Sequence, residues 1–305
     1  MAKKSSVEQL QEKDQEKFKG VADLYGGTSR AWEDILGDHW HHGYYDPGST
    51  VSKSDNAAAL IRMIDEVLRF GSVFSAENQE NKPKRILDIG CGIGGTCTYL
   101  ARKYGAHCTG ITISSGEVER AQALATAQGL QEKVSFEVAN ALALPFPDGQ
   151  FDLVWCMETA EHIPEKEQLV KEIVRVAAPG GQIILTSWCH RNLLPSEQSL
   201  PLDEQKFIKK MCDLVLMHPF CSVNEYINLF QSHHVEDMKT DDWCEFAKPF
   251  WTAMVGSACT IKGFFSLLWI GGWNSLKFVM GSNMMIKAHK KGLVKLLVLS
   301  CRKPR

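Results

Sequence analysis

From Arg85 onward, short apolar runs alternate with amphipathic runs, and this alternation leaves few folds open to the chain. Helical periodicity marks residues 95–104, 115–128 and 165–178. The apolar runs predict strands at residues 85–89, 107–113, 134–139, 151–157 and 182–188. Strands that alternate with helices are typical of a parallel sheet with right-handed crossovers. The sequence therefore predicts an α/β fold with a largely parallel sheet.

After Trp188 the pattern becomes less regular. Helices are predicted at residues 201–220 and 222–234, strands at 235–243 and 292–305, and a long apolar and aromatic helical stretch up to about Lys291. Residues 1–80 are polar and have helical periodicity, and they end in a charged linker. Late strands with helical insertions between them would extend the sheet and cover a substrate pocket.

Composition narrows the classes of partner. The 305 residues are 44% hydrophobic, which suits one elaborated domain or one domain with a cap, because single cores stop growing near about 250–300 residues. Lys and Arg total 34 against 36 Asp and Glu, so the net charge of -2 provides no field that would attract nucleic acid. We expect a partner that is recognised locally, and no nucleic acid.

Localisation is predicted from the cysteines and the apolar segments. The ten cysteines form no CxxC pair, and the first 25 residues mix acids with bases, unlike a secretory signal or an organellar transit peptide. The most apolar late segment, residues 263–273, is shorter than the ~20 residues of a membrane span. We expect a cytoplasmic protein without a transmembrane segment, and peripheral association with a membrane stays open.

The stretch ILDIGCGIGG, residues 86–95, places glycines where the first predicted strand turns into a helix. Gly90, Gly92 and Gly95 fit GxGxxG, which by itself allows a dinucleotide site or a tight turn without a ligand. Asp88 lies at the carboxyl end of the strand, where a carboxylate repels a pyrophosphate but suits an ammonium or sulfonium ion. An acid about 20 residues on, which would hold the ribose of NAD, is missing. These features favour S-adenosylmethionine over NAD.

Several motifs together resemble a known enzyme family. They are LDIGCGIGG, GITIS, VANALALPFPDGQFDLVW, METAEHIPEK and VAAPGGQIILTSW, with WEDILGDHWHHGYYDPG near the start and KKGLVKLLVLSCRKP near the end. This set resembles the class I S-adenosylmethionine-dependent methyltransferases, in particular the plant gamma-tocopherol-methyltransferase-like group. Within that group the chain is most similar to N-methyltransferases of monoterpenoid indole alkaloids, chiefly because tocopherol enzymes normally carry a plastid transit segment and none is visible here.

The resemblance implies a fold and a reaction. The fold would be a Rossmann-like sheet of seven strands, mostly parallel with the last strand antiparallel, with helices on both faces, an amino-terminal helical lid and helical cap insertions. The domains would be the lid (1–80), the S-adenosylmethionine-binding core (81–190) and the cap insertions with the closing strands (191–305). The reaction would be N-methylation of an amine or indoline nitrogen, leaving S-adenosylhomocysteine. The alternatives are C-methylation of a tocopherol, a dinucleotide-dependent oxidoreductase and a non-catalytic nucleotide binder.

The resemblance also assigns cofactor contacts. Carried onto this chain, the methionine part of the cofactor would be held by Asp88, Gly90, Gly92 and Gly94, and by a lid that contains Tyr25, Gly43 and Tyr44. The ribose end falls at Thr112 and Ile113, with Glu117 as an acceptor or as an acid in the first turn of a helix. Asn140 and Ala141 lie at the adenine, where the family usually has an Asp in place of Asn140. The histidines in residues 38–43 lie too close together to share one ion, so we predict no metal site.

The stretch CMETAEHIPE, residues 156–165, provides Glu158, Glu161 and His162 where the fourth predicted strand ends. Methyl transfer needs an unprotonated nucleophile aligned with the methyl carbon. Histidine can accept a proton near neutral pH, and a carboxylate can orient its ring. We predict His162 as the proton acceptor or a positioning residue, with Glu161 and Glu158 beside it. The same residues could instead cap the helix that follows.

The late segment is rich in aromatic residues, which would suit a pocket for a polycyclic alkaloid or simply a hydrophobic core. They are Trp188, Trp243, Phe246, Phe250, Trp251, Phe264, Phe265, Trp269 and Trp273. The same apolar segment is compatible with a homodimer.

Overall fold

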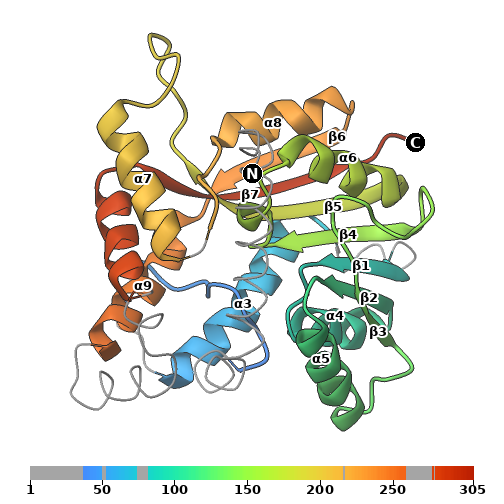
Figure 1. Ribbon diagram of the computed structural model, residues 1–305. Helices are drawn as coiled ribbons and strands as arrows, with labels where there is room; N and C mark the ends of the chain where they lie inside the picture. The colour runs from blue at the N-terminus through green and yellow to red at the C-terminus, as the bar shows by residue number, and fades with distance from the viewer. Residues whose placement is uncertain (1–36, 50–52, 74–81, 216, 259–276, 278) are drawn as a thin grey trace, which may run out of the picture.

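The structure is a computed structural model that describes residues 37–49, 53–73, 82–215, 217–258, 277 and 279–305. A sheet of seven strands forms its centre, in the order β3-β2-β1-β4-β5-β7-β6 (Figure 1). The strands are β1 (Arg85–Ile89), β2 (His107–Thr112), β3 (Val134–Val138), β4 (Phe151–Met157), β5 (Ala177–His190), β6 (Glu236–Asp242) and β7 (Val294–Arg302).

Strands β1 to β5 pair in parallel, and β7 lies antiparallel between β5 and β6. The predicted sheet of seven strands with an antiparallel last strand is therefore confirmed. Strand β5 begins at Ala177, five residues before the predicted strand at Gln182, because Ala177 already pairs with Phe151 at an irregular point of the ladder.

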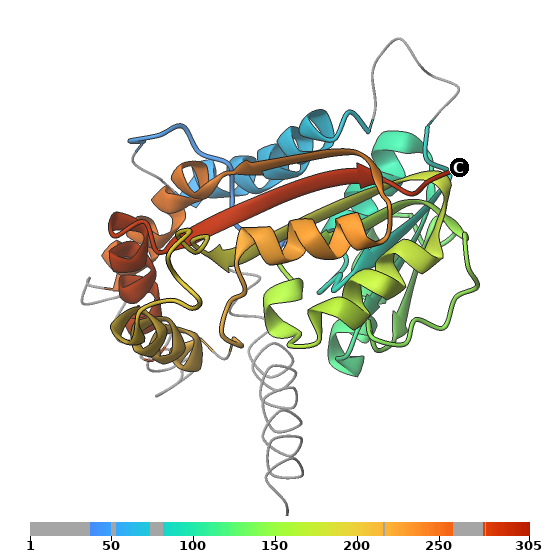
Figure 2. The ribbon, with the colours of Figure 1, turned by 90° about the horizontal axis from the view of Figure 1, so that it is seen from above.

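Helices cover both faces of the sheet, as Figure 2 shows from above. One face carries α3 (Lys53–Phe70), α4 (Gly95–Tyr104) and α5 (Ser115–Ala127), and the other carries α6 (Lys166–Val176) and α8 (Val223–Ser232). Helices α7 (Leu202–Leu214) and α9 (Cys244–Ala258) lie near the end of the sheet at which β5 finishes (Figure 1). Within the described residues, no helix is long and apolar enough to cross a membrane.

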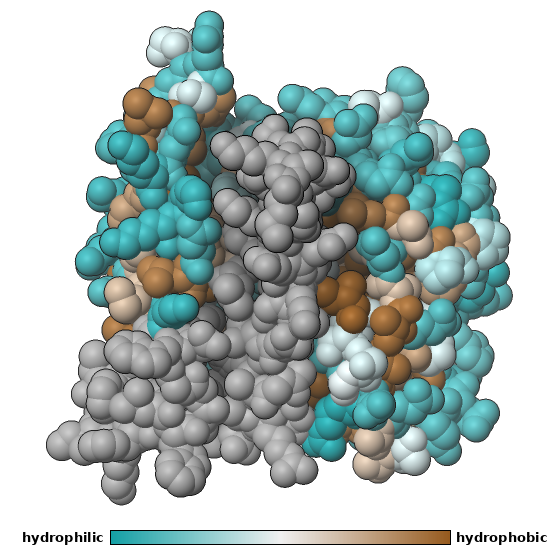
Figure 3. All heavy atoms as spheres, viewed as in Figure 1, coloured by the Kyte–Doolittle hydropathy of each residue, from teal (hydrophilic) through white to brown (hydrophobic). Residues whose placement is uncertain are grey.

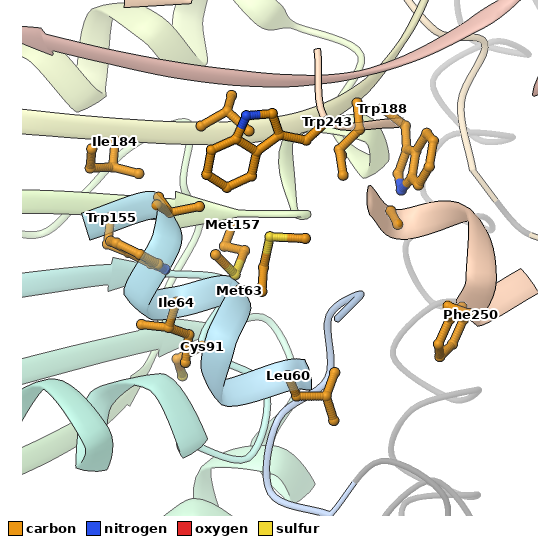
Figure 4. Close-up of a cluster of buried hydrophobic side chains, with 14 of the residues drawn as sticks. Leu60, Met63, Ile64, Cys91, Trp155, Met157, Ile184, Trp188, Trp243 and Phe250 are labelled. Carbon is orange, nitrogen blue, oxygen red and sulfur yellow. The ribbon is translucent and has the colours of Figure 1, made fainter. Parts of the chain in front are cut away.

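The core lies on both sides of the sheet because successive strand residues point to opposite faces. In β5, Ile184 packs with α3, whereas Ile183 and Leu185 pack with α6 and α8. Figure 4 shows the cluster on the α3 face, in which Met63 and Ile64 of α3 lie near the side chains of Met157 and Trp155 on the sheet. Burial on both faces explains why these strands are continuous apolar runs.

The predicted cap and lid are only partly described. Helices α7 and α8 lie within the predicted helical insertions, and α8 begins with a capping box between Ser222 and Glu225. Residues 279–290 form a further helix before β7. Of the predicted lid, the structure describes α3 and the segment before it, whereas residues 1–36 lie outside the described part. The division into three domains stays a prediction.

Candidate active site

A cavity opens at the carboxyl ends of β1, β2 and β4, where open α/β sheets bind ligands. Most of the residues predicted from the sequence line it: Asp88, Gly90, Gly92, Thr112, Ile113, Glu117, Asn140, Ala141, Glu158 and His162. In the space-filling view, hydrophilic side chains dominate the outer parts of this face of the molecule, and many hydrophobic ones lie nearer its middle (Figure 3).

The glycine loop brings bare backbone to the cavity. Gly90 and Gly92 have φ of 77° and 51°, a region that favours glycine. A Cβ atom on Gly90 would lie 2.1 Å from Oγ1 of Thr159, and one on Gly95 would lie 2.0 Å from the Asp38 carbonyl oxygen. Gly94 lies behind the cavity wall, where a Cβ atom would meet the Phe136 ring at 2.5 Å. The loop is thus fitted closely between β4 and the amino-terminal segment.

Asp88 is the buried acid of the cavity. Its side chain is 3% exposed and accepts a hydrogen bond from the Cys97 thiol, 3.4 Å away. Burial raises the pKa of Asp88 to about 7, although the bond from Cys97 acts in the opposite direction. A ligand with a positive charge would offset the cost of ionising this carboxyl group. The acid therefore suits the ammonium group or sulfonium centre of S-adenosylmethionine.

Glu117 lies both in the first turn of α5 and in the lining of the cavity. Its backbone N–H donates to Oγ of Ser114 as part of the α5 N-cap, 3.3 Å away, so it is an acid in the first turn. Its carboxyl group also faces the cavity and accepts from the Thr112 hydroxyl. Burial raises the pKa of Glu117, with the bond from Thr112 opposing it. A ribose hydroxyl at this end of the cavity would meet an acceptor.

Asn140 has a local partner. Its Oδ1 accepts from the Leu142 backbone N–H at 2.9 Å, which is an Asx-type turn. One of the two acceptor positions of this amide oxygen is thus used in the turn, and the contact with adenine stays a prediction. The loop that follows is held by Arg175 of α6, whose guanidinium donates to the Leu144 and Phe146 carbonyl oxygens at 3.0 and 2.7 Å.

The amino-terminal segment contributes residues that were not predicted. Asp38, Trp40 and His41 line the cavity. Gly43 and Tyr44 lie outside its lining, and Tyr44 stacks on Phe246 of α9 with ring centroids 4.3 Å apart. Tyr25 lies outside the described residues. The aromatic and histidine-rich composition of residues 38–43 was the available signal for this wall.

The predicted acid and base residues, Glu158, Glu161 and His162, do not all face the cavity. Glu158 and His162 line the cavity, but Glu161 is 2% exposed and accepts from the Ser187 hydroxyl at 3.2 Å, on the face covered by α6 and α8. Burial, together with the charge of Glu158, raises the pKa of Glu161 to about 8. The alternative reading as caps does not apply, because α6 begins at Lys166 and its N-cap residue Glu165 makes no side-chain cap.

Glu158 has a partner that no sequence motif indicated. Its Oε1 accepts from the His42 backbone N–H at 2.8 Å, and its Oε2 forms an ion pair with Nδ1 of the same residue. Burial alone would raise the pKa of Glu158, but the charge of His42, the hydrogen bonds from His42 and the charge of His41 outweigh burial and lower it. This carboxyl group is therefore held ionised beside the cavity.

The described aromatic residues of the late segment are largely core. Trp188, Trp243, Phe250 and Trp251 are at most 5% exposed, and Phe246 packs partly buried against the same cluster. Phe264, Phe265, Trp269 and Trp273 lie outside the described residues. Among the residues that the structure does describe, no group of three His, Cys, Asp or Glu side chains is arranged to hold a metal ion.

The known proteins that this chain resembles in sequence are methyltransferases. Residues 87–185 match the family described as "Methyltransferase domain". Over 94% of its length, the chain is 50% identical to tocopherol O-methyltransferase, chloroplastic, of Arabidopsis thaliana, of which it covers 82%. Over 95% of its length, it is 47% identical to norajmaline N-methyltransferase of Rauvolfia serpentina, of which it covers 99%.

Solved structures agree in fold. Geranyl diphosphate C-methyltransferase of Streptomyces coelicolor A3(2), in complex with Mg²⁺, geranyl diphosphate and S-adenosyl-L-homocysteine, superposes with a TM-score of 0.72. The superposition covers 94% of this chain and 97% of that one, at 15% sequence identity. At that identity the likeness concerns the fold.

Proposed function

This chain belongs to the S-adenosylmethionine-dependent methyltransferases, and from that premise we propose that it methylates an amine or indoline nitrogen of a plant monoterpenoid indole alkaloid. S-adenosylmethionine is the cofactor and supplies an electrophilic methyl group on a positively charged sulfur. Cytoplasmic location, peripheral association with a membrane and homodimer formation stay predictions.

The observation that carries the proposal is the carboxylate of Glu158 at the exit of β4, beside His162. When a neutral amine attacks the methyl group, the positive charge moves from sulfur to nitrogen. A fixed carboxylate near that nitrogen stabilises the transition state electrostatically. A phenol attacks as a phenolate, whose negative charge the same carboxylate would repel. The norajmaline N-methyltransferase relative supports the same reaction class.

The residues around the cavity would bind different parts of the cofactor and the substrate. Asp88 would bind the ammonium group of the methionine part, and Glu117 would accept from the ribose hydroxyls. The bare backbone of the glycine loop leaves room for the sulfonium arm. His162 would hold the substrate nitrogen in line with the methyl carbon and receive a proton from the product ammonium ion.

A second candidate is methylation of a tocopherol-like phenol, which the 50% identity to the Arabidopsis enzyme favours. The two candidates are separated by offering the protein S-adenosylmethionine with a labelled methyl group, together with secondary-amine alkaloids, indoline alkaloids and γ-tocopherol. NMR of the products then shows which atom gains the label. We expect the label on nitrogen. Transfer to a ring carbon or oxygen of tocopherol, with none to the alkaloids, would overturn the proposal.

A further inference from the structure

His42 is enclosed by aromatic rings. Its ring centroid lies 5.1 Å from that of Trp188, and 4.5 Å from those of Phe250 and Trp251. Trp188 comes from β5 and Phe250 from α9, as Figure 4 shows. The side chain of His42 is 9% exposed. We call these three rings the aromatic enclosure.

Within this enclosure, His42 has one polar attachment. In the part of the chain that the structure describes, its ring forms a hydrogen bond to Glu158 through Nδ1, whereas Nε2 is buried with no partner. Nδ1 is therefore the ring atom through which His42 contacts Glu158.

The orientation of the Glu158 carboxyl group is fixed by His42 and by the backbone of Glu158 itself. Both of its carboxyl oxygens interact with His42, which is 116 residues away in the sequence. Its backbone has φ of 50°, a conformation that is strained for a residue with a side chain and is common at functional sites. Glu158 also lines the cavity beside Thr159 and His162. The carboxylate is thus presented at the end of β4 in one orientation.

The charge of Glu158 depends on what surrounds it. A carboxyl group buried this deeply would be neutral without a positive partner. The titratable groups that act on it or respond to its charge are His41 and His42 of the amino-terminal segment, Tyr45 of the same segment, and Glu161 after β4. Glu161 carries the same sign, Tyr45 has no positive form, and burial lowers the pKa of His41. His42, which makes the direct contacts, is therefore the main group that favours the ionised carboxylate.

We propose that His42 is a positioning residue for methyl transfer, which holds Glu158 ionised and directed into the cavity, where the carboxylate faces the substrate nitrogen as it becomes positively charged. This inference rests on the proposed function. In the step itself, the lone pair of the nitrogen forms the N–C bond, and the electrons of the S–C bond return to sulfur. The positive charge thereby moves to the nitrogen, next to Glu158. His42 does not touch the reacting atoms and acts through the carboxylate.

The test uses two substitutions of His42 in the full chain. His42→Asn keeps an N–H donor near the position of Nδ1, whereas His42→Leu removes the donor and the charge and retains apolar volume within the aromatic enclosure. Because the loss of an opposite charge moves a carboxyl pKa by about 1–3 units, we expect His42→Leu to shift the acidic limb of kcat/KM upward by about 1–3 pH units.

At neutral pH, we expect kcat of His42→Leu to fall by about 10- to 100-fold, because the carboxylate loses the contacts that orient it and a preorganised charge is lost. His42→Asn should recover a substantial part of kcat. Affinity for S-adenosylhomocysteine, measured by calorimetry, should change by less than about threefold in both variants, because His42 lies outside the lining of the cofactor cavity. A purely structural role would lower stability without moving the pH profile.

The matched control is His39→Leu, in the same segment. The His39 ring is half-buried against His41 and Tyr99 and does not line the cavity. The pH profile of kcat/KM for His39→Leu should therefore match that of the unsubstituted protein. A folded His42→Leu variant with an unchanged pH profile and kcat would overturn the inference and leave the proposed function standing. If His42→Leu does not fold, Glu158→Gln provides the test, and full turnover in that variant would also overturn it. Failure of the unsubstituted protein to methylate any amine would instead reject the proposed function.

Discussion

Asp88 is a side chain whose ionisation and ligand binding are coupled. It lies within the glycine-loop strand, 3% exposed, and its hydrogen-bond partner is a thiol, which stabilises a carboxylate only weakly. Burial in such surroundings disfavours the charged form, so the pKa of Asp88 is raised to about 7. The ammonium group of the cofactor would reverse that preference. Binding and loss of a proton should therefore occur together.

The prediction at this scale concerns the pH dependence of cofactor affinity. Below about pH 7, Asp88 must lose a proton before it can pair with the ammonium group, so the affinity for S-adenosylhomocysteine should fall by about tenfold per pH unit. Above pH 7 the affinity should be flat. Calorimetry from pH 5.5 to 8.5 measures both regimes. Asp88→Asn should bind more weakly and without this slope, and a flat profile in the unsubstituted protein would contradict the assignment.

The turn from β1 into α4 is the element that shapes the cofactor cavity. Gly90 and Gly105 lie at opposite ends of this unit and both have positive φ, of 77° and 69°. They differ in their surroundings, because a Cβ atom on Gly90 would overlap the Thr159 side chain, whereas one on Gly105 meets nothing within 4 Å. Substitution of the two glycines therefore separates the cost of backbone strain, which both share, from the cost of a steric clash, which only Gly90 has.

We predict that Gly105→Ala costs about 1 kcal/mol in the free energy of unfolding, from the left-handed backbone alone, and leaves cofactor binding intact. Gly90→Ala should cost about 3 kcal/mol or more, because the same strain is joined by a clash that forces β1 and Thr159 apart, and cofactor binding should be lost. Urea unfolding and calorimetry with S-adenosylhomocysteine measure the two effects. Equal stability and intact binding in the two variants would show that the fit at Gly90 is unimportant.

On the scale of the whole molecule, the cavity is assembled from segments far apart in the chain. Its wall is formed by the loop after β1, the start of α5, the exit of β4 and three residues of the amino-terminal segment, Asp38, Trp40 and His41. The amino-terminal segment is attached through His42 to Glu158 and through Asp38 to Gln128, whose Nε2 donates to Oδ2 of Asp38 at 3.2 Å. A ligand that fills the cavity would hold these segments together.

We therefore predict that S-adenosylhomocysteine at about 100 times its Kd stabilises the protein by about 2.7 kcal/mol, and that NAD at the same concentration does not. Hydrogen exchange should show new protection of backbone amides over residues 38–45 as well as in the glycine loop. Thermal unfolding and exchange mass spectrometry provide the measurements. Stabilisation by NAD, or protection confined to the glycine loop, would contradict this account of the cavity.

How much was predictable differs between the elements and the site. The ranges of β1, β4 and α4 agree with the prediction to the residue, because periodicity and turn glycines are local signals. The predicted cofactor residues on the glycine loop, apart from Gly94, line the cavity at the edge where parallel strands end. Those at the end of β2 and after it, which came from the family resemblance, line it too. The family resemblance predicted an amino-terminal lid over the cofactor, but named Gly43 and Tyr44 instead of the residues that line the cavity. Those residues are Asp38, Trp40 and His41, and no local pattern shows which side chains of a distant segment will face a ligand.

The neighbouring pair Glu161 and His162 shows where local reasoning stops. Both follow β4 and were predicted to act together, but they lie in a 3₁₀ turn, Ala160–His162. With about three residues per turn, adjacent side chains point about 120° apart. Glu161 therefore faces Ser187 in the core, whose hydroxyl also bonds with Tyr226, while His162 faces the cavity. Glu158, two residues before that turn, pairs with His42 instead.

By itself, the sequence determined the order of strands and helices, the glycine turn and the cofactor class, because each depends on residues close together in the chain. Only the tertiary structure decided which acid faces the cavity, which one is buried behind it and which histidine holds the first in place. The physical reason is that the charge of a buried carboxyl group is set by its neighbours in space. For Glu158 the decisive neighbour lies 116 residues away.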